Sequence, residues 1–201
     1  MPFSKRIATR DFHPPDHVSF ASSHPPHIKA FQSTVMITNP WNTAQTQGIP
    51  VWPTHCVQGT PGSNIIPELD VSKVDHVVDK GRDSRVEMFS VFADGFGNKT
   101  SAASEDVATL LRSAGVRHVF VVGVAGDYCV KHTATDAKKE GFDVFVIEEA
   151  VRSIDHGPRG WSAAKEDFQQ HDIKVISMEG PEITQLRTQS PSLERQGSQA
   201  S

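Results

Sequence analysis

The feature that most constrains the fold is an apolar run followed at once by a small-residue turn and a helical pattern, within residues 118–140. Residues 119–122 are all apolar, which predicts a strand buried on both faces. Residues 123–127 predict a tight turn, and a helical pattern runs from about 128 to 140. Cys129 is therefore expected where a buried strand passes into the first turn of a helix.

A cysteine at a helix N-terminus has unusual chemistry. Free backbone N–H groups and the positive end of the helix dipole both favour a thiolate there. We therefore interpret Cys129 as a nucleophile with an anion-stabilising pocket beside it; the alternative is a buried, inert thiol. The second cysteine, Cys56, cannot build a disulfide framework with it, so a reducing, intracellular compartment (cytoplasm, nucleus or both) is expected.

Composition narrows the class of protein. The chain has 201 residues, enough for one domain with a sizeable core. A net charge of −4 argues against a nucleic-acid partner. No apolar run reaches the length of a membrane span, and no apolar signal segment opens the chain, so no membrane partner is expected. Homo-oligomerisation is left open.

Strand and helix patterns alternate along the chain. Strands are expected at 5–9, 72–80, 119–122, 142–147 and 173–178, and helices at 100–115, 128–140 and 162–171. This alternation predicts an α/β fold in three layers, α/β/α, with a mainly parallel sheet. Ligands gather at the carboxyl ends of such strands. Asp11, Lys80 and Cys129 each follow a strand, so they should converge on one edge of the sheet.

A metal site is expected near the same edge. Asp11 and His13 are two residues apart, which places both side chains on one side of an extended segment. His55, on a proline-constrained segment with Trp52, is the candidate third ligand. Two histidines and a carboxylate form a recurring divalent-metal site. The alternative interpretation is that His13 and His55 are solvated loop histidines. The corresponding alternative for Lys80 is a solvated surface lysine. Residues 19–48 show no clear periodicity and are expected to cover the metal cleft.

Four segments together carry a family resemblance: TRDFHPPDHVSF, VWPTHCVQGT, VDKGRDSRVEMFSVF and VVGVAGDYCVKHTATDA. The chain resembles the isochorismatase-like cysteine hydrolases and, among them, the fungal nicotinamidases. The resemblance extends over most of residues 7–178. It implies hydrolysis of nicotinamide to nicotinate and ammonia in NAD salvage, through a cysteine thioester. The implied partner is thus a small-molecule substrate.

The resemblance also implies roles for individual residues. Asp11, His13 and His55 would hold a divalent metal, usually zinc, which would orient the pyridine nitrogen of the substrate. Lys80 would be the catalytic lysine and Cys129 the nucleophile. The backbone N–H groups of Ala125 and Cys129 would form the oxyanion hole, and the peptide bond between Val124 and Ala125 would be cis. Trp52 and Phe89 would be walls of the substrate pocket. Val124 and Ala125 would also contact the substrate.

The chain departs from the family pattern at its start. The family carries its catalytic aspartate in a D-x-Q-x-D-F motif on its first, central strand, and this sequence has no such motif. Residues 1–179 are therefore expected to be an N-terminally truncated hydrolase domain that lacks the first strand, and 180–201 a disordered tail. Two alternatives remain: another amide hydrolase of the superfamily, or a remnant that only binds metal or ligand because the aspartate is absent.

Overall fold

The computed structural model describes residues 3–99 and 102–188. Its strands are β1 (Ile7–Asp11), β2 (Thr34–Thr38), β3 (Thr46–Pro50), β4 (His76–Lys80), β5 (His118–Val124), β6 (Asp143–Arg152) and β7 (Lys174–Ile176). Its α-helices are α1 (Val107–Ser113), α2 (Cys129–Lys139), α3 (Ala163–Gln170) and α4 (Pro181–Thr188). Strands and helices alternate over the second half of the chain, so the predicted α/β class is correct.

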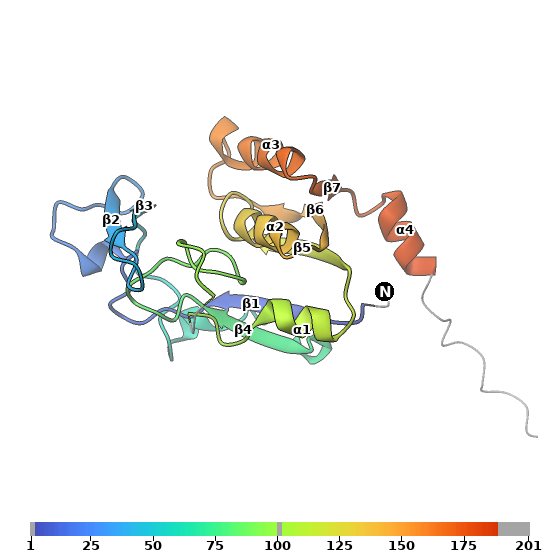
Figure 1. The fold of residues 1–201 in the computed structure, drawn as a ribbon, viewed down its shortest axis with the longest axis horizontal. Coiled ribbons are helices and arrows are strands. Elements are labelled where there is room, and N and C mark those ends of the chain that lie inside the picture. Colours follow the sequence, from blue (N-terminus) through green and yellow to red (C-terminus); the bar gives the residue numbers. More distant parts are fainter. Residues whose placement is uncertain (1–2, 100–101, 189–201) are drawn as a thin grey trace, which may run out of the picture.

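The parallel strands form two sheets instead of the single sheet that the alternation predicts. β1 pairs with β4, while β5, β6 and β7 form a separate parallel sheet (Figure 1). One continuous sheet would need a strand hydrogen-bonded to both groups, and residues 3–99 and 102–188 contain none. A third, antiparallel pair, β2 and β3, stands at the other end of the molecule from α4.

A single apolar core nevertheless joins the two parallel sheets. Val78 of β4, Val121 of β5 and Val144 of β6 belong to one cluster of buried side chains, and α1 and α2 contribute Leu111 and Ala134 to it. α2 packs against both β5 and β6. Burial of this shared cluster, rather than a continuous ladder of backbone hydrogen bonds, holds the two halves together.

The opposite face of β6 is covered by the last helix. Alternate residues of a strand point to opposite faces: Val146 faces the main core, and Ile147 packs with Ile176 of β7 and Ile183 of α4 in a second cluster. The prediction of a disordered tail from residue 180 is therefore wrong for 181–188, where the fully buried Ile183 fixes the helix. Residues 189–201 lie outside the described part.

Two other predicted elements need correction. The helix expected at 100–115 is confined to α1, because the Asp106 side chain accepts a hydrogen bond from Thr109 N (3.1 Å) and caps it; residues 100–101 lie outside the described part. The segment 19–48 contains β2 and part of β3. The alternation of apolar and polar residues is weak because each strand of this hairpin has only one buried side chain, Ile37 in β2 and Ile49 in β3.

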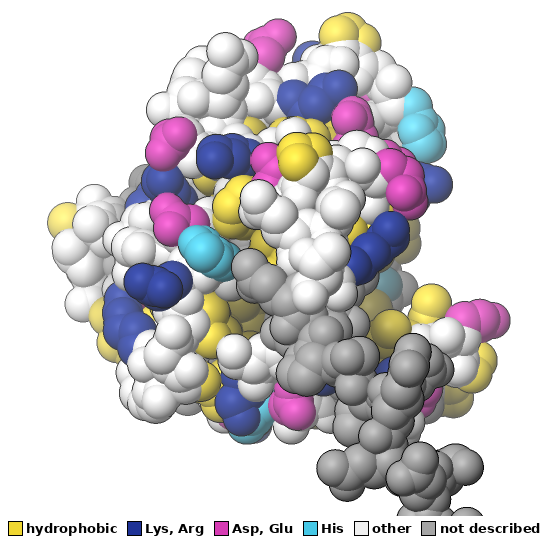
Figure 2. Space-filling view, turned by 90° about the vertical axis from the view of Figure 1, so that its right-hand side faces the viewer, with side chains coloured by type: hydrophobic (Ala, Val, Ile, Leu, Met, Phe, Trp, Pro, Cys, Tyr) yellow, Lys and Arg dark blue, Asp and Glu magenta, His cyan; other side chains and the backbone are white. Residues whose placement is uncertain are grey.

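The face of the molecule shown in Figure 2 carries charges of both signs. Acidic and basic side chains are interspersed over the face shown in Figure 2, with hydrophobic side chains visible between them. No helix in the described ranges is long and apolar enough to cross a membrane.

Candidate active site

Three predicted site residues meet at the carboxyl ends of the strands. Asp11 ends β1 and Lys80 ends β4, and the two are register partners in the parallel ladder. Their side chains form an ion pair. Lys80 Nζ also lies 3.4 Å from Cys129 Sγ and donates to the Met88 carbonyl (3.0 Å). The predicted convergence of Asp11, Lys80 and Cys129 is therefore present.

The charges of this group hold one another in place. Burial acts to lower the pKa of Lys80, but the Asp11 carboxylate and Cys129 outweigh burial, so the pKa is raised and the ammonium persists. Burial acts to raise the pKa of Asp11, but Lys80 and His13 outweigh it, and the pKa is lowered. The pair is thus ionised across the neutral range.

Cys129 behaves differently from the expectation of a favoured thiolate. Burial raises the pKa of its thiol, and the charge of Lys80 only partly offsets this effect. At the start of α2 the helix dipole and the free N–H groups favour a thiolate, but the burial of the sulfur by tertiary packing has the larger effect on its pKa. In the ligand-free chain Cys129 is therefore a thiol, and its proton has to leave before the sulfur can attack.

The predicted metal ligands also lie together. One ligand atom from each of Asp11, His13 and His55 lies within 4.8 Å of the others. His13 Nδ1 donates to the Gly81 carbonyl and His55 Nδ1 to the Pro53 carbonyl, each at 2.8 Å. These bonds leave both Nε2 atoms as acceptors, which is the usual way in which an outer hydrogen bond orients a metal-binding imidazole. The donor set fits a divalent cation.

A buried polar network adjoins the metal ligands, and sequence reasoning missed it. The His17 ring packs at a tilt against that of His13 (centroids 4.1 Å apart, planes at 35°). Its Nδ1 is hydrogen-bonded to Ser19 Oγ (2.8 Å). Ser19 in turn hydrogen-bonds the Glu87 carboxylate. Burial raises the pKa of Glu87 to about 7, against the opposing effects of the Met88 N–H and Lys80. Asp11 and Glu87 are both carboxylates whose charge acts on Cys129.

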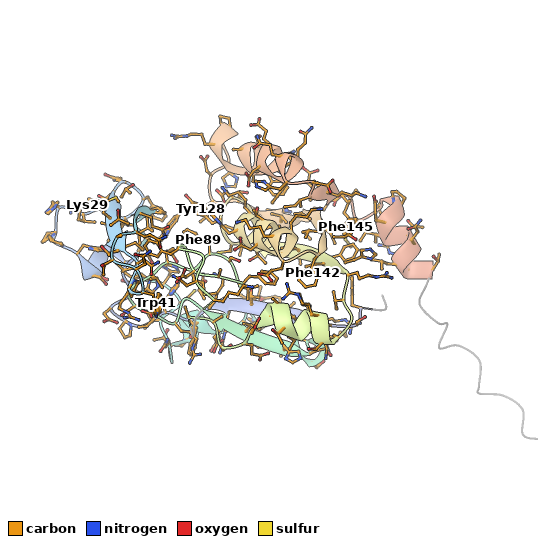
Figure 3. The ribbon with its side chains drawn as sticks, in the orientation of Figure 1. Lys29, Trp41, Phe89, Tyr128, Phe142 and Phe145 are labelled. Carbon is orange, nitrogen blue, oxygen red and sulfur yellow. The ribbon has the colours of Figure 1, made fainter. Side chains whose placement is uncertain are left out.

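An apolar cavity of about 380 Å³ opens beside Cys129. Trp52 and Phe89, both expected as walls, line it together with Tyr128. The Tyr128 ring lies 4.9 Å from that of Trp52 and 5.2 Å from that of Phe89 (centroids), and Figure 3 shows Phe89 and Tyr128 next to each other. Tyr128 was missed although it directly precedes Cys129. The shape and lining suit a small aromatic ligand.

The turn before α2 completes the cavity. The peptide bond between Val124 and Ala125 is cis, as the resemblance implied, and both residues line the cavity. Cys129 is the first residue of α2, where backbone N–H groups have no partner within the helix. The turn therefore places backbone donors beside the sulfur, an arrangement that can stabilise a developing oxyanion.

Comparison with known proteins gives a consistent result. Residues 20–180 match the Isochorismatase domain model. The chain is 34% identical to the nicotinamidase of Schizosaccharomyces pombe over 181 residues, 90% of this chain and 77% of the relative. It is similar to the structure of yeast nicotinamidase bound to the inhibitor nicotinaldehyde, with a TM-score of 0.78, 32% identity, and 87% and 80% of the two chains covered. It is also similar to the structure of the pyrazinamidase of Pyrococcus horikoshii in complex with zinc, with a TM-score of 0.59 and 30% identity. That match covers 85% of this chain and 74% of the other.

Proposed function

This chain belongs to the isochorismatase-domain family, and within it to the nicotinamidase amidohydrolases, and we propose that it hydrolyses nicotinamide to nicotinate and ammonia. The observation that supports this activity best is the meeting of a nucleophile, a buried cation and a metal-type ligand set around one aromatic-lined cavity. A yeast relative binds nicotinaldehyde, the aldehyde counterpart of nicotinamide. We place the reaction in NAD salvage.

The proposed reaction begins with loss of the Cys129 proton. The Lys80 ammonium stabilises the thiolate. The proposed proton acceptor is Glu87, which lines the cavity and whose charge acts on Cys129. The thiolate attacks the carboxamide carbon, and the oxyanion that develops is held by the N–H groups of Ala125 and Cys129. The proton is then passed to the amide nitrogen, which leaves as ammonia. Water hydrolyses the remaining thioester to release nicotinate.

The aromatic residues orient the substrate ring. Trp52, Phe89 and Tyr128 form a slot in which a pyridine ring can stack or pack edge-on. Asp11, His13 and His55 would hold the divalent cation, which we propose to be zinc because two imidazoles and a carboxylate suit that ion. When bound, the cation supplies a Lewis-acid site for a ring nitrogen of the substrate.

Ammonia release from nicotinamide by the zinc-loaded chain tests this function. We expect turnover that is abolished by Cys129→Ala and retained by Cys56→Ala, because Cys56 does not line the cavity. This second cysteine is the matched control, since both variants remove one partly buried thiol. Absence of turnover from a folded, zinc-loaded chain would refute the proposed hydrolysis and favour a protein that only binds metal or ligand.

A further inference from the structure

Phe31 occupies an unusual place at the mouth of the aromatic cavity. It lines the cavity from the loop that precedes β2, yet 68% of its surface is exposed. Its ring packs edge-on against Trp52, with centroids 5.7 Å apart and planes at 83°. An aromatic side chain that is left largely open to solvent beside an apolar cavity has a face available for a bound ring.

The backbone around Phe31 is fixed to the segment directly after β3, which carries Trp52. Phe31 N donates to the Val51 carbonyl (2.8 Å), and Val51 N donates to the Ser33 carbonyl (3.1 Å). Ser33 N also bonds the Lys29 carbonyl (2.9 Å), which closes the loop whose outer part Lys29 marks in Figure 3. The loop is therefore held by main-chain hydrogen bonds on both sides of Phe31.

Phe31 adopts a backbone conformation that a bulky side chain disfavours. Its φ is +63°, in the left-handed region where glycine is preferred. The hydrogen bonds that hold the loop here, from Phe31 N to the Val51 carbonyl and from Ser33 N to the Lys29 carbonyl, join main-chain atoms. The edge-on contact with Trp52 leaves most of the ring exposed, so the disfavoured backbone conformation presents an open aromatic face at the mouth of the cavity.

We propose that Phe31 is a specificity residue that forms the outer wall of the substrate pocket and selects aromatic carboxamides. This role rests on the proposed hydrolysis of nicotinamide. Trp52, Phe89 and Tyr128 line the inner part of the cavity, and the Phe31 ring adds a contact at its mouth that an aromatic substrate can make and an aliphatic amide cannot. The contact acts on substrate binding, because no hydrogen bond or ring contact in the described part of the chain joins the Phe31 side chain to Cys129 or Lys80.

Four variants separate this role from a structural one. Phe31→Gly and Phe31→Ala both remove the ring, but glycine suits the positive φ, so the glycine variant should be at least as stable as the wild type. Phe31→Tyr restores an aromatic wall. Met36→Ala is the matched control, because Met36 is also 68% exposed, lies on the adjoining hairpin and does not line the cavity.

The readouts are thermal stability, steady-state kinetics, and calorimetric binding of nicotinamide to the zinc-loaded chain with Cys129→Ala. We expect Phe31→Gly to raise the KM for nicotinamide about two- to tenfold with little change in kcat, and to leave kcat/KM for propionamide unchanged. Phe31→Tyr should restore the KM. Unchanged nicotinamide affinity in Phe31→Gly, or an equal loss in Met36→Ala, would overturn the proposal.

The two proposals can fail separately. Turnover with the same KM in wild type and Phe31→Gly would leave the hydrolysis standing and refute the outer wall. Binding of nicotinamide that weakens in the Phe31→Gly, Cys129→Ala double variant, without turnover by the wild type, would support the outer wall and refute the hydrolysis.

Discussion

Gly81 is not a ligand, yet a single methyl group added there should damage the metal site. The Cβ of Gly81→Ala would lie 2.4 Å from His13 Cε1 and 2.6 Å from His13 Nδ1. Ordinary carbon contacts are at about 3.5 Å, so the imidazole would have to move by about 1 Å. His13 is 2% exposed and its ring packs against that of His17, which leaves little room for that movement.

The expected loss follows from what the displacement does to His13. Moving the ring disturbs the hydrogen bond from His13 Nδ1 to the Gly81 carbonyl, which orients Nε2 toward the other ligands. Loss of such an orienting partner typically costs about 10–100-fold in metal affinity. Alanine at a φ of +67° adds about 1 kcal/mol of backbone destabilisation.

Gly115→Ala separates these two effects. Gly115 has nearly the same φ, +66°, but an added Cβ would meet nothing within 4 Å. The assay is zinc affinity by competition with a chromophoric chelator, together with urea denaturation of the zinc-free chains. We expect both variants to lose similar backbone stability and only Gly81→Ala to lose zinc affinity. Wild-type zinc affinity in Gly81→Ala, or an equal loss in Gly115→Ala, would refute the reasoning.

Three further predictions concern the buried charges and the ligand set. Glu87→Gln should change how the free energy of unfolding depends on pH, because the pKa of the Glu87 carboxyl is near 4.5 in the unfolded chain and about 7 in the folded chain. As the pH rises between these two values, the wild type should lose about 3 kcal/mol of stability relative to the variant. Urea denaturation measures this difference. His55→Ala should remove one of three ligands and abolish stoichiometric zinc binding, measured by elemental analysis. Lys80→Met should destabilise the chain by about 3 kcal/mol, because it leaves the partly buried Asp11 carboxylate without its partner, and should abolish turnover.

Each of these predictions has a contradicting result. Parallel stability curves for wild type and Glu87→Gln would mean that the carboxyl does not hold its proton in the folded chain. Full zinc content in His55→Ala would remove His55 from the ligand set. Lys73→Met is the control for Lys80, because its pair with Asp70 is exposed and should contribute little to stability. Equal losses in the two variants would contradict the buried-pair interpretation.

Local sequence determined the elements whose signal lies within a few residues. The apolar run of β5 and the periodicity of α2 place Cys129 at a strand-to-helix turn with no knowledge of the rest of the chain. The two-residue spacing of Asp11 and His13 likewise placed two metal ligands on one side. The family motifs then supplied the roles of these residues and the cis peptide bond at Val124–Ala125.

Tertiary structure decided everything that depends on long-range contacts. α4 lies in a polar segment and is fixed by Ile183, which packs against Ile147 of β6 and Ile176 of β7. The raised pKa of Cys129 comes from burial under other segments, which overrides the local helix N-terminus. Phe31 reaches the cavity only because its loop bonds to Val51.

The separation into two parallel sheets has the same origin. Periodicity predicts that a segment forms a strand, but hydrogen-bond partners are chosen by the whole chain. Asp11 and Lys80 are 69 residues apart, and Lys80 and Cys129 are 49 apart. Their contact, and thus the site itself, exists only because one shared core holds β1, β4 and β5 together.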